Sequence, residues 1–364
     1  MMVLSLPSPW CAQGLAQTAP PITPSGLTTQ VDLSSTPPTG RMQYDITGGT
    51  RAGTNLFHSF GIFNVPTGVI ANFLNDTSLD TTTILSRVTG GQTSTIFGTI
   101  QTSGFGQANF FLMNPAGIVV GPTASLNVGG SVAFTTAAYL RFADNGRFHA
   151  VPNAAADALL STAPVAAYGF LSANPGTITI QGSELIASEI SLVGRTIAIG
   201  PAARDNGTVQ QARLFARNGT IRLASGVSPG EFDAMTLQSV PNLNEASFTS
   251  FGSIVLAPGS TVNVRETSRV SIRGGQLVLD VSEATISTAG RLGPPGTIVL
   301  NTGSQMVSAT SGTEPGADVH IISEESVALR ANSSIATRTM GAGSGGDVSV
   351  TTPTILFQAE SNIV

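Results

Sequence analysis

The chain has 364 residues, of which 41% are hydrophobic and only 10% are charged, so it has enough apolar side chains to fold and too little net charge to stay disordered. It has no lysine, and a net charge of −5 gives no electrostatic footprint for nucleic acid or an anionic membrane. The single cysteine, Cys11, excludes an internal disulfide and a cysteine-based zinc site. The abundance of glycine, threonine, serine and valine favours strands and turns over helices.

Residues 1–23 are predicted to be a weak or shortened signal peptide followed by a flexible tail. Met1–Leu6 is weakly apolar and lacks a basic region, but Gly14-Leu15-Ala16 forms a small-x-small cleavage pattern. Pro20–Gly40 is rich in proline, threonine and serine and is expected to lead into the folded domain as an extended segment. No later stretch has the roughly 20 apolar residues of a membrane helix, so no integral membrane span is expected.

The next region, Arg51–Phe148, is dense in ordered motifs. Its motifs are Gly53-Thr-Asn-Leu-Phe-His-Ser-Phe60, Phe63-Asn-Val-Pro-Thr-Gly68, Ile84-Leu-Ser-Arg-Val-Thr-Gly-Gly91, Ala108-Asn-Phe-Phe-Leu-Met-Asn-Pro-Ala-Gly-Ile-Val-Val-Gly-Pro122 and Ala124-Ser-Leu-Asn-Val-Gly-Gly-Ser131. Asn114–Gly117 predicts a tight turn, because proline fixes φ, asparagine can bond to the backbone and glycine tolerates a positive φ. The structural interpretation is a corner between the strands Phe110–Leu112 and Ile118–Val120.

The order of these motifs resembles the N-terminal secretion domain of filamentous haemagglutinin-like exoproteins over roughly residues 25–180, with the family's Asn-Pro-Asn-Gly-Ile signature present as Asn114-Pro-Ala-Gly-Ile118. The resemblance implies an all-β fold, a right-handed parallel β-helix (solenoid) with an N-terminal cap and small extra-helical β elements. It also implies two-partner secretion: export through a cognate outer-membrane β-barrel transporter that recognises this domain. Ala116 stands where the family has a second asparagine, which removes one amide that a transporter could bind.

The resemblance further implies a set of residues for transporter recognition or for folding of the secretion domain: Asn55, His58, Asn64, Asn109, Asn114, Pro115, Gly117 and Ile118. Each also has a purely structural interpretation. A lone histidine in an apolar stretch, such as His58, is far more often a structural residue than a metal ligand, and no metal or cofactor is predicted. Four phenylalanines are expected to fill the core inside the helix: Phe57, Phe60, Phe63 and Phe73.

From about Pro175 a glycine turn followed by a short strand of alternating apolar residues recurs. These strands end at Ile180, Leu223, Leu256, Leu300 and Val350. The steps from Leu277 to Ile298 and from Val327 to Val348 are both 21 residues (298 − 277 and 348 − 327). About 20 residues per step without helices is typical of one β-helix coil, which cannot bury its core alone. A sandwich or propeller is less favoured because hairpin signals are sparse, and a leucine-rich repeat because its spacing is missing.

Three regions are therefore predicted: residues 1–23 as signal and tail, 24–175 as the two-partner secretion domain, and 176–364 as a β-helical shaft that is expected to continue in a longer native protein. The predicted function is a secreted or surface-exposed adhesin-type exoprotein of a Gram-negative bacterium. Its expected partners are the cognate outer-membrane transporter and host-cell, neighbouring-cell or glycan ligands, and nucleic acid is not expected.

An enzyme is not predicted. β-Helical polysaccharide lyases and hydrolases gather carboxylates on one outer face, whereas the acidic residues here are scattered and the adjacent pair Glu324-Glu325 is expected to be solvated. No nucleophile elbow, phosphate loop or zinc-protease motif is present, and Gly341–Asp347 is expected to be a flexible turn rather than a calcium repeat. The remaining alternative is a β-helical polysaccharide-binding or polysaccharide-degrading protein, which an acidic and aromatic groove would support.

Overall fold

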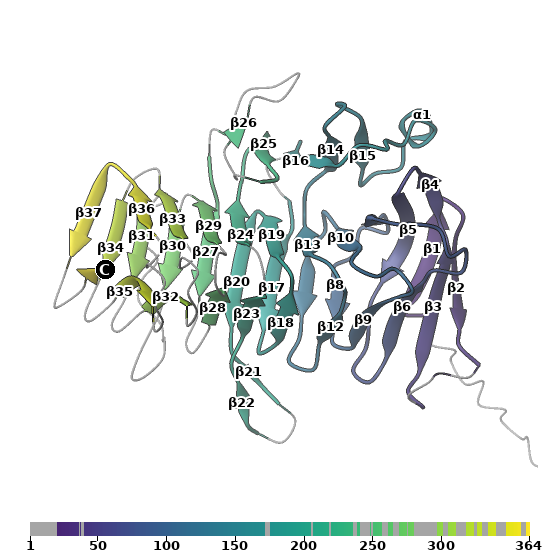
Figure 1. Ribbon diagram of the computed structural model, residues 1–364, viewed down its shortest axis with the longest axis horizontal. Helices are drawn as coiled ribbons and strands as arrows, with labels where there is room; N and C mark the ends of the chain where they lie inside the picture. Colours follow the sequence, from purple (N-terminus) through teal and green to yellow (C-terminus); the bar gives the residue numbers. More distant parts are fainter. Residues whose placement is uncertain are drawn as a thin grey trace, which may run out of the picture.

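The computed structural model describes residues 20–35, 37, 40–171, 175–204, 207–217, 220–235, 239–240, 248, 250–256, 261–264, 269–274, 276–279, 297–300, 305–310, 318–323, 326–329, 334–339, 347–357 and 362–364. The described residues are almost entirely β-strand and form an elongated stack of coils (Figure 1). The predicted signal region up to residue 19, the Glu324-Glu325 pair and residues 341–346 lie outside the described residues.

One face of the stack is an 11-stranded sheet, called the long sheet below. In spatial order its strands are β1 (Ile22–Gly26), β5 (Asn55–Phe63), β7 (Thr83–Val88), β10 (Asn109–Met113), β13 (Val132–Thr135), β19 (Ile190–Gly194), β24 (Ile221–Ser225), β29 (Arg269–Gly274), β33 (Asp318–Ser323) and β36 (Val348–Thr351), with β4 (Thr50–Ala52) beside β5. Every pairing from β5 to β36 is parallel. Each coil therefore contributes one strand to this sheet, and successive coils contribute neighbouring strands.

The second face is a nine-stranded parallel sheet, called the second sheet. Its strands are β8 (Ser94–Ile96), β11 (Ile118–Val120), β17 (Thr177–Gln181), β20 (Thr196–Gly200), β27 (Ser253–Leu256), β30 (Gln276–Leu279), β31 (Thr297–Leu300), β34 (Ser326–Leu329) and β37 (Thr354–Phe357). Three of the predicted glycine-led strands, those ending at Ile180, Leu256 and Leu300, are β17, β27 and β31 of this sheet, whereas those ending at Leu223 and Val350 are β24 and β36 of the long sheet.

Three shorter sheets in succession form the third face. They are β2 (Thr29–Leu33), β3 (Gln43–Gly48), β6 (Ile70–Leu74), β9 (Thr99–Ser103) and β12 (Ser125–Asn127), then β18 (Glu184–Ala187), β23 (Arg213–Ala216) and β28 (Thr261–Val264), then β32 (Gln305–Thr310), β35 (Ser334–Thr339) and β38 (Asn362–Ile363). β12 contacts β18, and β28 contacts β32, so the face is continuous from one sheet to the next. The chain thus passes through three faces in each coil, and the predicted parallel β-helix is confirmed.

The coil length predicted from the sequence is right at one place and wrong at another. Val278 pairs with Val299, a step of 21 residues (299 − 278), as predicted from Leu277 and Ile298. Val327, however, pairs with Ile355 in the second sheet, a step of 28 (355 − 327), whereas Val348 belongs to the long sheet. The second 21-residue step therefore joins two different faces. Strands of both faces alternate apolar and polar residues, so the pattern alone cannot assign a strand to a face.

The first coils are closed by antiparallel strands. β1 pairs with β5 and β2 pairs with β3, both antiparallel. The extended segment predicted at Pro20–Gly40 therefore supplies two cap strands. Pairing by β1 and β2 covers strand edges that would otherwise be open for association with other chains.

A five-stranded antiparallel sheet, called the outer sheet, lies outside the coils (Figure 1). In spatial order its strands are β15 (Arg147–His149), β14 (Tyr139–Phe142), β16 (Val165–Phe170), β25 (Gly230–Asp233) and β26 (Ser239–Val240), and the short helix α1 (Ala154–Asp157) lies between β15 and β16 in the chain. Two chain segments build this sheet: the first, with β14, β15 and β16, lies between β13 and β17, and the second, with β25 and β26, lies between β24 and β27. Each segment thus leaves the β-helix after a long-sheet strand and returns at a second-sheet strand. With the small hairpin of β21 (Ala202–Ala203) and β22 (Val209–Gln210), it confirms the predicted extra-helical elements.

Two hydrophobic cores result, one inside the coils and one beneath the outer sheet. Phe60, Phe63 and Phe73 lie in the inner core, as predicted. Phe57 lies in the outer core against Phe142 and Phe148, with ring centroids 5.9 and 5.0 Å away, so its predicted place inside the helix is wrong. Because successive side chains of a strand point to opposite faces, Phe57 and Phe60 cannot both point inward from β5.

Phe134→Ala should lower the free energy of unfolding by about 3–5 kcal/mol, because the Phe134 ring of β13 is fully buried in the inner core and its removal leaves a cavity. Urea denaturation followed by circular dichroism measures the change. Leu33→Ala is the control: Leu33 is 60% exposed, and the expected change is below about 0.5 kcal/mol. Equal losses in the two variants would contradict the inward placement of Phe134.

Candidate functional site

The candidate site residues lie mainly at the two ends of long-sheet strands. Asn55 and Asn109 are the first residues of β5 and β10, whereas Asn64 and Asn114 directly follow the last residues of these strands. Asn114 begins the turn that leads into β11, whose first residue is Ile118. At the carboxyl ends of the long-sheet strands the structure places Asn64, Asn114, Pro115, Gly117 and Ile118. Asn55, His58 and Asn109 lie elsewhere on β5 and β10.

The chain passes from the long sheet to the second sheet at residues 64, 92–95, 114–117 and 176, which form the exit corner. Asn114 is 1% exposed, and its side chain makes three hydrogen bonds there. Its Nδ2 donates to Gln92 O and Ser94 Oγ, both at 2.9 Å, and its Oδ1 accepts from Ala116 N at 3.0 Å. The Gly117 N–H donates to Asn114 O at 3.0 Å and closes the predicted turn. Asn114 thus fixes its own turn and ties it to the coil below.

Asn64 lies two coils before Asn114 and ties its own coil to the coil above. Its Oδ1 accepts from the backbone N of Thr95 at 2.8 Å and from the Thr95 hydroxyl at 3.0 Å. At the next coil, the backbone N of Gly176 donates to Pro115 O at 2.7 Å. Four successive coils are therefore hydrogen-bonded to one another at the exit corner, and the asparagine side chains add ties to the backbone hydrogen bonds made there.

Gly117 and Ile118 complete the corner in different ways. Gly117 has φ +121°, a conformation that L side chains rarely adopt, and a Cβ there would lie 3.1 Å from Thr177 O in the coil above. Ile118 is fully buried in the inner core and starts the second-sheet strand. The turn therefore needs glycine at its end and a core residue directly after it.

The other two asparagines act at the opposite ends of their strands. Asn55 is buried, and its Nδ2 donates to the carbonyl oxygens of Ser161 and Ala163, both at 2.9 Å. These carbonyls belong to the segment between α1 and β16, so Asn55 fastens the outer sheet to the first coil. Asn109 accepts from Ser131 N at 2.9 Å through its Oδ1 and so ties β10 to the coil above.

His58 points into the inner core from the middle of β5. It is 1% exposed, its ring lies 5.4 Å from the Phe73 ring, and its Nδ1 has no hydrogen-bond partner within the described part of the chain. Burial, and to a smaller extent the charge of Arg51, lowers the pKa of His58 to about 3. His58 is therefore neutral in the folded protein and fills space in the cap.

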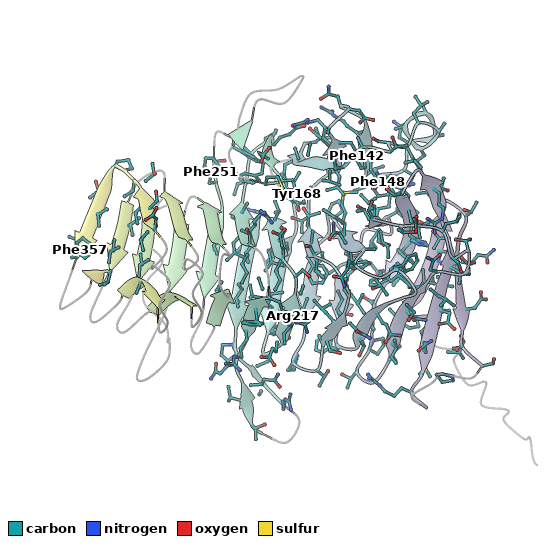
Figure 2. All side chains as sticks on the ribbon, viewed as in Figure 1. Phe142, Phe148, Tyr168, Arg217, Phe251 and Phe357 are labelled. Carbon is teal, nitrogen blue, oxygen red and sulfur yellow. The ribbon has the colours of Figure 1, made fainter. Side chains whose placement is uncertain are left out.

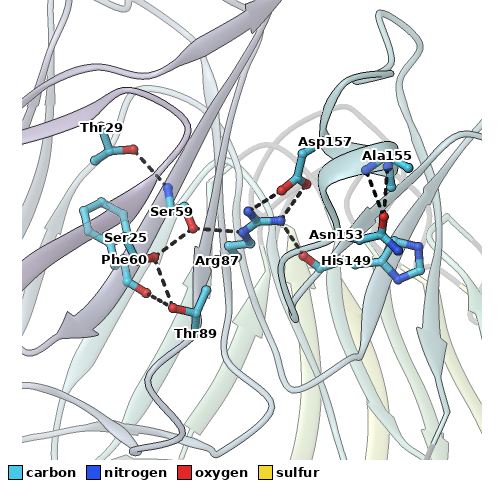
Figure 3. A network of polar contacts seen from close by, with 11 residues as sticks. Ser25, Thr29, Ser59, Phe60, Arg87, Thr89, His149, Asn153, Ala155 and Asp157 are labelled. Carbon is cyan, nitrogen blue, oxygen red and sulfur yellow. Dashed lines mark hydrogen bonds and ion pairs between the residues drawn. The ribbon is translucent and has the colours of Figure 1, made fainter.

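Sequence reasoning missed a buried ion pair that holds the outer sheet in place (Figure 3). Arg87, on β7, is 1% exposed, and its guanidinium contacts both carboxylate oxygens of Asp157 at 2.8 and 2.7 Å. It also donates to His149 O at 3.0 Å and to Ser59 Oγ at 2.9 Å, and it lies over the Phe148 ring. An arginine among the apolar residues of the Ile84–Val88 strand was the available signal, because a buried charge requires a partner.

A second buried carboxylate was also missed. Glu231, on β25, has a fully buried side chain, accepts from the Tyr139 hydroxyl at 2.6 Å and pairs with Arg141 Nε at 2.8 Å. Tyr139 and Arg141 both belong to β14, so Glu231 joins the two segments of the outer sheet. Its sequence neighbourhood gives no hint of this role, because the partners lie about 90 residues earlier.

The candidate asparagine side chains hydrogen-bond to other parts of the fold and hold backbone segments in place. Within the described residues, no group of three or more histidine, cysteine, aspartate or glutamate side chains is placed to hold a metal ion. No described helix is long and apolar enough to span a membrane. Together, these features define the class of the molecule: a capped parallel β-helix with asparagine-tied corners and an outer sheet locked by buried ion pairs.

Comparison with known proteins gives the family. The sequence profile of the TPS secretion domain matches residues 22–364. The filamentous hemagglutinin secretion domain is similar, with a TM-score of 0.43 and 15% identity over 94% of this chain and 99% of that chain. The HMW1 secretion domain from Haemophilus influenzae has a TM-score of 0.42 and 14% identity over 94% of this chain and 98% of that chain. No curated protein matches the sequence.

Because the profile covers nearly the whole chain, the protein belongs to the TPS secretion domain family. It is a two-partner secretion exoprotein, secreted to the cell surface or extracellular space of a Gram-negative bacterium, and the predicted family is confirmed. Membership implies a cognate outer-membrane transporter as the partner. The family is not an enzyme family, while the absence of catalysis in this chain stays a prediction. The division at residue 175 also stays a prediction.

Asn114→Ala should destabilise the fold by about 1–3 kcal/mol, because it removes the hydrogen bond to Gln92 O and leaves the buried Ser94 Oγ without its donor. Urea denaturation measures the loss. Asn127→Ala is the matched control, since Asn127 is exposed and the side-chain hydrogen bond it loses is a single one, to Gln101. The role of the corner would be refuted by an Asn114→Ala variant as stable as the Asn127→Ala variant.

His58 should make the protein less stable as the pH falls. The unfolded chain binds a proton at His58 near pH 6.5, whereas the folded protein does so only near pH 3, so stability present above pH 6.5 is lost between these values. The full loss is up to about 5 kcal/mol at low pH. His58→Phe removes the titration and suits the aromatic surroundings, so its unfolding free energy should fall less between pH 7.5 and pH 4.5. Identical pH profiles for the two proteins would rule this out.

Proposed function

We propose that this chain is a surface adhesin whose N-terminal region, residues 24–175, is recognised by its cognate outer-membrane barrel transporter. Family membership supports the transporter, and the position of the asparagine ties within this region supports a link between its folding and export. Residues 176–364 serve as a shaft, since stacked coils offer an extended surface for partners. The proposed adhesion ligands are molecules on a host cell or a neighbouring cell, or glycans.

The buried state of the exit corner limits how a transporter can use it. Asn114 is almost fully buried and its amide is satisfied inside the fold, so a partner cannot reach it once the corner has formed. Recognition of its side chain would have to precede folding. We propose instead that Asn114 acts after transit, by fixing the third coil on the second so that later coils can stack.

Folding outside the cell then favours release from the transporter. Each added coil buries apolar side chains that were exposed in the unfolded chain, and this burial lowers the free energy of the exported part. The cap supplies the first surface on which a coil can pair, because β3 pairs with β6 and β5 pairs with β7 in parallel. Export and folding are therefore coupled in the proposed function.

The test is a secretion assay in a Gram-negative host that carries the chain with its transporter. Deleting the transporter gene should leave the protein in the periplasm, and undiminished secretion without the transporter would overturn the proposed export route. Asn114→Ala should lower the amount of secreted, protease-resistant protein, because the corner ties are lost.

Ser94→Ala separates the two possible roles of Asn114. It removes the hydroxyl that accepts from Asn114 Nδ2 but leaves the Asn114-Pro-Ala-Gly-Ile118 motif unchanged. If Asn114 acts through folding, Ser94→Ala should lower secretion in the same direction. Normal secretion of Ser94→Ala together with loss in Asn114→Ala would instead indicate direct recognition of the unfolded motif.

A further inference from the structure

A cavity of about 200 Å³ lies between the long sheet and the outer sheet. Its floor crosses the coils near the first residues of β7, β10, β13, β19 and β24, and its other wall comes from β16 and the residues after β25. Figure 2 shows Tyr168 in this position, between the outer elements and the coils. The cavity is separate from the exit corner, which lies at the opposite ends of the same strands.

The cavity exists because two small side chains follow one another across the coils. Phe111, Ala133, Ser191 and Arg222 are consecutive partners in the parallel register of the long sheet, and all four line the cavity. Side chains in register on neighbouring strands lie about 5 Å apart, so the space above Ala133 and Ser191 is bounded by the larger Phe111 and Arg222. The shape of the cavity is therefore set by the side chains at this one register position in four successive coils.

Polar groups line the floor at several coils. Asn109 and Ser131 lie side by side and are joined by the hydrogen bond from Ser131 N to Asn109 Oδ1. Ser191 on the floor and Tyr168 on the opposite wall both line the cavity, and burial raises the pKa of Tyr168 to about 12, so the phenol stays uncharged. Hydroxyl, amide and phenol groups both donate and accept hydrogen bonds, which suits a ligand that is rich in hydroxyl groups.

The charges in the cavity cancel. Arg222 is buried and its Nη1 contacts Glu189 Oε2 at 2.9 Å, while its Nε donates to Met235 O at 3.0 Å. Glu189 Oε1 accepts from Thr220 N at 3.2 Å. A guanidinium already paired with a carboxylate offers no net charge to an anion or a cation, so the cavity favours a neutral ligand.

Apolar side chains line the cavity on both sides. Phe111 on the floor is half-buried, and Val165 and Ala234 face it from the outer sheet side. A flat aromatic ring beside apolar groups packs against C–H surface, while the polar floor bonds hydroxyls. The volume is below the about 300–1,000 Å³ of pockets that hold drug-sized molecules, which limits the ligand to a single ring.

We propose that this cavity binds one neutral sugar ring, such as a hexose unit at the end of a glycan. Ala133 and Ser191 provide the space, Phe111 packs against the C–H face of the ring, and Asn109, Ser131 and Ser191 bond its hydroxyl groups. Sugar binding at this site does not depend on transporter recognition, so its test and the secretion assay can fail independently of each other.

The experiment uses the full chain and ligand-observed nuclear magnetic resonance with the methyl glycosides of glucose, galactose, mannose and N-acetylglucosamine, and with methyl glucuronide as the anionic probe. At least one neutral glycoside should bind, and methyl glucuronide should bind more weakly. The proposal is overturned if no neutral glycoside binds at millimolar concentration, or if the anionic probe binds best.

Ala133→Leu tests whether the glycoside binds in this cavity. It fills the cavity without removing a polar group and should weaken glycoside binding by about tenfold or more, because the ring loses its space. Ala198→Leu is the matched control, since Ala198 lies between the inward-facing Ile197 and Ile199 of β20 on the outer face of another sheet, and binding should be unchanged. Equal binding by Ala133→Leu and the native chain would overturn the assignment.

Ser191→Ala provides a second test that does not add volume. It removes one hydroxyl from the floor and should weaken binding by about threefold to tenfold, the usual contribution of one hydrogen bond. Circular dichroism establishes that each variant is folded. If Ala133→Leu fails to fold, unchanged binding by Ser191→Ala overturns the proposal, and weakened binding supports it.

Discussion

Stacking of each coil on the coil before it is the constraint on which this structure depends. A single coil exposes the apolar side chains of all its strands, and only the neighbouring coils cover them. The parallel register must therefore be kept at every turn, because a slip of one residue would turn an inward row of side chains outward. The exit corner shows how this is done: Asn64 and Asn114 bond to the neighbouring coil where the backbone bends away from its ladder.

The long sheet serves two cores at once, and this explains the composition of its first strands. In β5, His58 and Phe60 face the inner core, whereas Asn55 and Phe57 face the outer sheet. A strand covered on both faces has little room for charged side chains, so the one charge of β7, Arg87, is neutralised by Asp157. The scarcity of charged residues in β5 and β7 is thus a consequence of covering these strands on both faces.

The sequence predicted the fold better than the role of particular side chains. The glycine-led strands, the turn at Asn114–Gly117 and the coil step at Val278 follow from local patterns, and all are confirmed. The place of Phe57 and the second 21-residue step were wrong, because alternation identifies a half-buried strand but not which face looks inward. The Glu231 contacts could not be predicted, because they join segments that no local pattern relates.

The coils and the outer sheet differ in how far along the chain their contacts reach. Parallel coil contacts join residues as few as 19 apart, as for Ile178 and Ile197 (197 − 178), whereas the Tyr139–Glu231 contact spans 92. Contacts between near residues cost less chain entropy and form earlier. β14 and β16 can therefore pair with each other early, whereas β25, which carries the buried carboxylate partner of Arg141, adds to β16 later. When the N-terminal coils fold first, they can stack without β25, and the outer sheet is completed only when β25 pairs with β16.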